Sequence, residues 1–267
     1  MKTPPEQAIL AAGIEHDWSD VFFPQSSRPP ERFLRSSHHS PPLRIQSPFP
    51  AEAAATVLGW LEGEAKEPDS VLEVGAGCGR FLRELLRERS HFRRAMACEP
   101  MAAKADFLRW IFGPSGPDRE IPCRDHLARI HRFTVSHPGA SRSGAPPVEV
   151  RAATLEELAP EVERNGTPFG LVACLNVIDH VPEPHTFPNL LARVTQPQGY
   201  LAISSPLDWH EEFTPRRHWR NDLSAFFRDS PTWEILHGIS VPFIFRPAYR
   251  TLVVFQSKIL LLRRRED

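Results

Sequence analysis

The sequence predicts an α/β protein built on a seven-stranded, mostly parallel sheet with helices on both faces. Three observations favour this fold. From Val71 onward, short apolar runs alternate with segments of helical periodicity, the pattern of parallel strands joined by crossover helices. A glycine-rich turn separates the first strand from its helix. The last two apolar runs, residues 233–246 and 252–263, follow each other without a helix and indicate an antiparallel terminal strand pair.

The elements are expected in the following order. Residues 1–50 are rich in proline and serine, so we expect a mostly irregular N-terminal segment or lid with a short helix near residues 5–12. A domain of residues 51–267 begins with a helix at 51–62. Strands are then expected at 71–74, 95–98, 148–150, 170–175 and 200–204, and helices at 80–89, 102–112, 155–164 and 184–195. Residues 113–147, with GPSGP and SHPGASRSGAPP, interrupt the alternation as an insertion in which 124–132 could form one or two helical turns.

Composition limits the function classes. The 267 residues are 41% hydrophobic and carry a net charge of -1, so no overall field attracts nucleic acid or an anionic membrane. The four cysteines form no Cys-x-x-Cys pair, and from the composition of the start and the short apolar runs we expect neither a signal peptide nor a membrane-spanning segment. His38 and His39 form the only tight histidine pair, and adjacent side chains point apart, so we expect no metal site. We expect a cytoplasmic protein that binds a small molecule.

The segment VLEVGAGCGRF at residues 71–81 carries the clearest chemical signal. Gly75, Gly77 and Gly79 separate a buried strand from a helix, and glycine lets the backbone turn sharply and approach a ligand. The N–H groups at the start of the following helix suit a carboxylate. A dinucleotide would require G-x-G-x-x-G, with glycine at the position of Arg80, so the spacing argues against that ligand.

The G-x-G-x-G spacing, preceded by Glu73, resembles the first motif of the class I S-adenosylmethionine-dependent methyltransferases. The resemblance implies a Rossmann-like fold and a loop that cradles the methionine part of S-adenosylmethionine, with S-adenosylhomocysteine as product. Glu99 ends the second strand and is expected to accept both ribose hydroxyls. No acid follows the third strand, so Thr154 or a backbone group is expected at the adenine. The implied cofactor-binding residues are Glu73, Gly75, Ala76, Gly77, Gly79, Glu99, Pro100, Thr154 and Asn176.

The segment ACLNVIDHV, residues 173–181, ends the fourth strand, where this superfamily places the methyl acceptor. Methyl transfer depends on holding the nucleophile about 3 Å from the methyl carbon and on excluding water. Asn176, Asp179 and His180 are the catalytic candidates. Asp179 or His180 would accept a proton or orient the acceptor; the alternative for Asp179 is a turn acid before Pro182. The Asn/Asp-Pro-Pro-aromatic motif of enzymes that methylate bases or glutamine is absent.

Residues 205–219 and 241–256 resemble the C-terminal 4-mercaptohistidine N1-methyltransferase domain of ovothiol biosynthesis, and more distantly the DREV-type protein-histidine methyltransferases. The likeness runs from about Val71 to the C-terminus without the insertion. It implies N-methylation of the imidazole of a thio- or selenohistidine-like small molecule, which needs no strong base because neutral imidazole is nucleophilic. The implied substrate-binding residues are Asp179, the aromatic Trp209 and Phe213, the acidic Glu211 and Glu212, and the basic Arg246 and Arg250.

Other functions stay open from the sequence. One is a natural-product N-, O- or S-methyltransferase whose acceptor is set by a lid at residues 36–50, with Arg44 and Gln46. A protein-histidine methyltransferase is another. A third, from a different class, is a non-catalytic S-adenosylmethionine-binding scaffold, against which Glu73, Glu99 and the three loop glycines argue. The exact acceptor, the ring nitrogen and the number of subunits are not specified.

Overall fold

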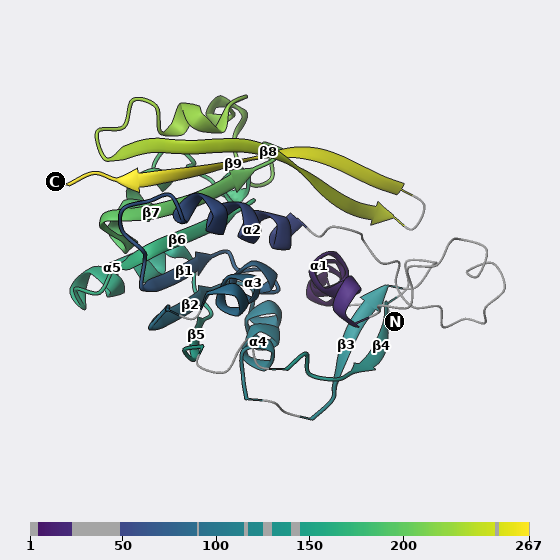
Figure 1. The fold of residues 1–267 in the computed structure, drawn as a ribbon. Coiled ribbons are helices and arrows are strands. Elements are labelled where there is room, and N and C mark those ends of the chain that lie inside the picture. The colour runs from purple at the N-terminus through teal and green to yellow at the C-terminus, as the bar shows by residue number, and fades with distance from the viewer. Residues whose placement is uncertain are drawn as a thin grey trace.

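A computed structural model describes residues 5–22, 49–89, 91–114, 117–124, 130–139, 145–248 and 251–266. Its seven-stranded sheet consists of β1 (Ser70–Val74), β2 (Arg94–Cys98), β5 (Val148–Arg151), β6 (Phe169–Leu175), β7 (Thr195–Ser205), β8 (Trp233–Ala248) and β9 (Thr251–Arg264). The strands lie in the order β5-β2-β1-β6-β7-β9-β8 (Figure 1). The first five in this order are parallel, and β9 runs antiparallel to both β7 and β8. The predicted fold class is confirmed.

Two groups of helices cover the two faces of the sheet. Alternate residues of a strand face opposite sides, so Val71 packs with one core cluster and Leu72 with the other. The cluster around Val71 takes its helical residues mainly from α2 (Phe49–Leu61) and α3 (Arg80–Glu88), together with α4 (Ala102–Ile111). The cluster around Leu72 takes them from α5 (Leu155–Arg164) and α6 (Phe187–Val194). These helices lie within a few residues of the predicted ranges.

The N-terminal helix is longer than the sequence analysis expected. Helix α1 runs over Pro5–Phe22, and its Leu10, Ile14 and Trp18, spaced four residues apart, are buried. The proline-rich composition of residues 1–50 obscured this helix, although only Pro5, at its first position, lies within it. Residues 23–48 of the expected lid, including Arg44 and Gln46, lie outside the described residues, and residues 49–50 begin α2.

The insertion forms a small antiparallel sheet of β3 (Arg119–Arg124) and β4 (Ile130–Val135). The helical turns expected within 124–132 are therefore wrong where the chain is described. Ile121 and Cys123 on β3 are buried against α1. Their spacing of two residues is the period of a strand. Figure 1 shows α1 lying beside β3 and β4, so the insertion supports the N-terminal helix.

The terminal hairpin of β8 and β9 reaches beyond the rest of the sheet. Strand β9 pairs with β7 only over Lys258–Arg263, whereas it pairs with β8 along most of both strands. The distal half of the hairpin therefore extends past β7 toward α1, as Figure 1 shows. The turn expected at residues 246–250 lies partly outside the described residues.

Candidate active site

The loop between β1 and α3 is shaped by its three glycines. Gly75, Gly77 and Gly79 have φ angles of 67°, 56° and 78°, in the left-handed region that favours glycine. A Cβ at Gly75 would lie 2.4 Å from the Val177 side chain, and one at Gly79 would lie 2.5 Å from Leu108. At Gly77 the nearest atom to a Cβ would be Asp17 Oδ2 at 3.9 Å. Two glycines are thus required by packing, while the third exposes backbone to open space.

That space is a cavity of about 530 Å³. It lies between the glycine loop, α1, the start of α2 and the distal part of β8. Six residues predicted for the site line it: Glu73, Gly75, Ala76, Gly77, Asn176 and His180. They meet because β1 and β6 are adjacent parallel strands, so the segments after Val74 and after Leu175 leave the same edge of the sheet.

Carboxylates surround the glycine loop. Glu73 is 4% exposed and its Oε2 accepts a hydrogen bond from the Leu82 N–H. Burial raises the pKa of Glu73 well above its ordinary value, and the charges of Asp17 and Glu99 raise it further. Glu99 Oε2 accepts from the Gly77 N–H at 2.9 Å, and its Oε1 accepts from the Met101 N–H at 3.0 Å.

The nearby Arg80 does not pair with Glu73 or Glu99, because its guanidinium is hydrogen-bonded to two other acids. It donates two hydrogen bonds to the Asp20 carboxylate, at 2.7 and 3.0 Å, and one to Glu84 at 2.5 Å. The cavity therefore offers the carboxyl groups of Asp17 and Glu73 beside exposed loop backbone. This combination fits the sulfonium and ammonium groups of S-adenosylmethionine, so the residues present suit the expected cofactor.

The segment after β6 is held by hydrogen bonds from two neighbouring strands. Asn176 adopts a φ of 54°, and its Oδ1 accepts from the hydroxyls of Ser204 and Ser257 at 2.9 and 2.8 Å. This leaves the amide NH₂ of Asn176 as the group available to a ligand in the cavity. His180 ends the short helix η3 (Ile178–His180), lines the cavity and meets the Phe213 ring edge-on at 5.0 Å.

Residues 49–233 match the family model described as a methyltransferase domain. The chain belongs to this family. The predicted enzyme class, an S-adenosylmethionine-dependent methyltransferase, and the predicted cofactor are confirmed. The further likeness to ovothiol biosynthesis is not shown by these comparisons.

The methyltransferase is similar to curated proteins named ubiquinone biosynthesis O-methyltransferase. It is 23% identical over 203 residues to the protein of Paracidovorax citrulli, covering 75% of this chain and 61% of that protein. It is 28% identical over 166 residues to the protein of Alkalilimnicola ehrlichii, covering 61% of this chain and 50% of that protein. The chain therefore spans about half to three fifths of the length of these relatives.

Solved structures share the fold of the methyltransferase. The N-methyltransferase NodS from Bradyrhizobium japonicum WM9 has a TM-score of 0.51 at 12% identity, covering 83% of this chain and 99% of that one. The O-methyltransferase TomG from Streptomyces achromogenes, described in complex with SAM, has a TM-score of 0.51 at 12% identity, covering 98% and 91%. Within the described residues of the methyltransferase, no helix has the length and apolar character needed to cross a bilayer.

Asp179 lies outside the cavity lining of the methyltransferase. Its side chain is fully buried, and its Oδ2 accepts a hydrogen bond from the Asp208 N–H at 3.1 Å. Burial raises the pKa of Asp179. In this arrangement the carboxyl group holds the turn after β7. Its predicted roles at the acceptor stay predictions.

The predicted substrate residues of the C-terminal third also lie outside the cavity lining, as far as they are described. Trp209 stacks on Trp219 with ring centroids 6.5 Å apart and donates to the Arg220 carbonyl. Glu211 pairs with Arg216, and Glu212 is exposed. Phe213, which contacts His180, is 42% exposed. The side chain of Arg246 and all of Arg250 lie outside the described residues, so the substrate-binding set stays a prediction.

Four predicted cofactor residues lie outside the cavity lining: Gly79, Glu99, Pro100 and Thr154. Thr154 is the N-cap of α5, where its hydroxyl accepts from the Glu157 N–H and the Glu157 carboxylate accepts from the Thr154 N–H at 2.8 Å. Pro100 is exposed just after Glu99. Their contacts with a cofactor remain predictions.

Helix α1 brings two residues to the site that were not predicted from the sequence. His16 and Asp17 both line the cavity, and His16 Nδ1 lies 2.7 Å from Asp17 Oδ1. His16 Nε2 is buried and has no hydrogen-bond partner, and the ring meets Phe243 edge-on at 4.9 Å. The sequence signal that could have found them is the spacing of Leu10, Ile14 and Trp18. This spacing indicates a helix that continues beyond its expected end and includes His16.

Proposed function

We propose that this methyltransferase O-methylates a hydroxyl group of a small, largely apolar acceptor bound between α1 and β8. The observation that carries the proposal is the His16–Asp17 pair on the cavity wall, in which Asp17 holds one imidazole nitrogen and the other is buried without a hydrogen-bond partner. When bound, S-adenosylmethionine supplies a methyl group on a sulfonium. A hydroxyl becomes a strong nucleophile toward such a group when its proton is removed.

His16 provides the proton acceptor. The proton of the acceptor hydroxyl passes to His16 Nε2, and the imidazolium formed is stabilised by the Asp17 carboxylate at Nδ1. Asp17 also fixes the tautomer that leaves Nε2 free, so it is a positioning residue. A positioned histidine base contributes about 10²–10⁴-fold to the rate of such reactions.

The wall of the cavity supports an acceptor with an apolar, flat body. Phe49 at the start of α2 and Phe243 and Phe245 on β8 line it, with Ile9 of α1. Phe49 and Phe243 meet edge-on with centroids 5.5 Å apart. Aromatic walls favour planar ligands and exclude water from the methyl acceptor. The relatives named ubiquinone biosynthesis O-methyltransferase support the same class of reaction.

The imidazole acceptor expected from the sequence is the rival substrate. A neutral imidazole already carries its nucleophilic lone pair and needs no base, so it gives the free Nε2 of His16 no role. The described residues predicted to bind it, Trp209, Glu211 and Glu212, lie outside the cavity lining. Imidazole methylation, methylation of natural-product nitrogen or sulfur, and the cytoplasmic location stay predictions.

Incubation with labelled S-adenosylmethionine and a panel of acceptors tests the proposal. The panel contains phenols and catechols of increasing apolar bulk, and histidine, thiohistidine, selenohistidine and histidine peptides. We expect label on hydroxyl compounds and none on imidazoles. Turnover of imidazoles alone would overturn the proposal, and cofactor binding without turnover of any acceptor would favour the scaffold function.

A further inference from the structure

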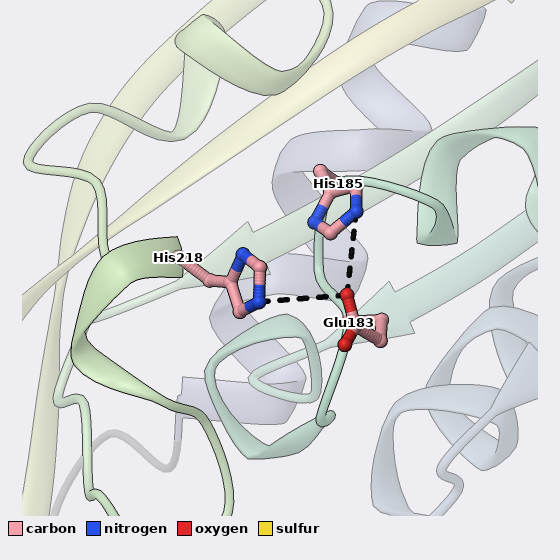
Figure 2. Close-up of side chains that lie close together, drawn as sticks. All are labelled: Glu183, His185 and His218. Carbon is pink, nitrogen blue, oxygen red and sulfur yellow. Dashed lines mark ion pairs between the residues drawn. The ribbon is translucent and has the colours of Figure 1, made fainter.

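Glu183, His185 and His218 form a cluster away from the cavity. Glu183 and His185 lie in the loop between η3 and α6, and His218 ends the short helix η4 (Arg216–His218). Figure 2 shows both imidazoles directed at the Glu183 carboxylate. Two segments separated by more than thirty residues thus bring three good ligands for a borderline transition metal to one place. The sequence analysis expected no metal site because this proximity arises only on folding.

Two of the distances within the cluster match those around a tetrahedral ion. Glu183 Oε2 lies 3.3 Å from His185 Nε2 and 3.5 Å from His218 Nε2, and ligand atoms of all three residues fall within 4.8 Å of one another. Bonds of 2.0–2.1 Å from Zn²⁺ to nitrogen or oxygen put tetrahedral ligand atoms about 3.3–3.4 Å apart. The two distances to Glu183 are therefore those expected of ligands that share one ion.

The state of His218 is a second, independent observation. Its side chain is only 15% exposed, and its buried Nε2 atom makes no hydrogen bond, with Glu183 Oε2 at 3.5 Å. A buried polar nitrogen without a hydrogen bond costs free energy, and a metal bond would remove that cost. The neighbouring Arg216 does not oppose a cation here, because it pairs with Glu211 and lies over the Trp219 ring.

We propose that Glu183, His185 and His218 bind one Zn²⁺ ion, with water in the remaining coordination position. The ion ties η4 to the loop that follows His180. The same two segments are already joined by Thr214, whose hydroxyl donates to the Val181 carbonyl at 2.6 Å. The metal thus acts as a clamp that stabilises the segment carrying His180 beside the cavity.

Zinc binding to the full, untagged chain tests the proposal. Metal-free protein is titrated with ZnCl₂ in a calorimeter, and its thermal unfolding is followed with and without the ion. We expect one Zn²⁺ per chain and a higher unfolding temperature when it is bound. His185→Ala and Glu183→Gln change exposed side chains and should fold, whereas His218→Ala removes the more buried ligand. Loss of an outer-shell partner already costs about 10–100-fold in metal affinity, so each variant should bind at least about tenfold more weakly.

The matched control is His210→Ala. His210 pairs with Asp208 at 3.4 Å on the surface, which is the same kind of histidine–carboxylate contact outside the cluster. This variant should bind zinc like the wild type, and Co²⁺ should give the visible absorption of a tetrahedral site in both. Equal zinc affinity in all four variants, or no binding by the wild type, would overturn the proposal.

Discussion

At the scale of single residues, the site contains buried acids that are paired with arginine and buried acids that are not. Glu84 and Glu73 are both 4% exposed, but Glu84 is paired with Arg80 and Arg87, at 2.5 and 2.9 Å. Glu73 accepts one backbone hydrogen bond and lies near two further carboxylates. A buried, unpaired carboxylate costs stability and serves to bind a cation. Glu73 therefore contributes to function at the expense of the cofactor-free fold.

Glu73→Gln is expected to stabilise the cofactor-free protein at pH 7 and to weaken S-adenosylmethionine binding. The pKa of Glu73 in the folded state is raised above its ordinary value of 4.5. As the pH rises above 4.5, the carboxyl group ionises more readily in the unfolded chain than in the folded one, so the wild type loses stability. Glutamine does not ionise, so the gain should be present at pH 7 and vanish below about pH 4.5. Calorimetric unfolding at both pH values and cofactor titration measure the two effects.

The control for this prediction is the same substitution at Glu84. Because Glu84 is paired, Glu84→Gln leaves Arg80 and Arg87 with a weaker partner and should destabilise the protein at pH 7. Opposite signs are the expected result. If Glu73→Gln destabilised the cofactor-free protein as Glu84→Gln does, the account of Glu73 as an uncompensated acid would be wrong.

At the scale of elements, helix α1 serves both the core and the cavity with different faces. Ile14 is fully buried among Cys78, Phe107 and Ile121, whereas Ile9 is 46% exposed and lines the cavity. The periodicity of a helix separates these two roles within one turn and a half. The helix is therefore held by one face while the other face contacts ligands.

The matched pair Ile14→Ala and Ile9→Ala tests this division. Ile14→Ala should cost about 2–5 kcal/mol of unfolding free energy, since it leaves a cavity in a packed cluster. Ile9→Ala should change stability by no more than about 0.5 kcal/mol but raise the KM of the acceptor. Denaturant unfolding and steady-state kinetics provide the measurements. Similar stability losses in both variants would contradict the assignment of the two faces.

Most elements could be predicted from the sequence because their signals are local. The glycine spacing and the alternation of periods placed β1, α3, β6 and α5 within a residue or two. Helix α1 was cut short because composition outweighed its apolar spacing, and β3 and β4 were missed in a segment rich in glycine and proline. His16 meets Phe243 only through tertiary packing over more than two hundred residues, which no local pattern reports.

At the scale of the whole molecule, four distant parts of the chain meet at one edge of the sheet. The glycine loop and the Asn176 segment leave adjacent parallel strands, and this part follows from the predicted fold. Helix α1 and the distal part of β8 close the cavity from the two ends of the chain. The meeting of the glycine loop and the Asn176 segment could therefore be predicted from the sequence. The packing of α1 and β8 against them could not, because no local sequence pattern reports it.

Single-turnover methyl transfer by the wild type and by His16→Gln tests whether His16 removes a proton from the acceptor. The rate is measured at saturating S-adenosylmethionine with a hydroxyl acceptor, and cofactor affinity is measured in parallel. If His16 is the base, the rate should be about 10²–10⁴-fold lower in the variant, with cofactor affinity unchanged. Equal transfer rates in the two proteins would contradict it.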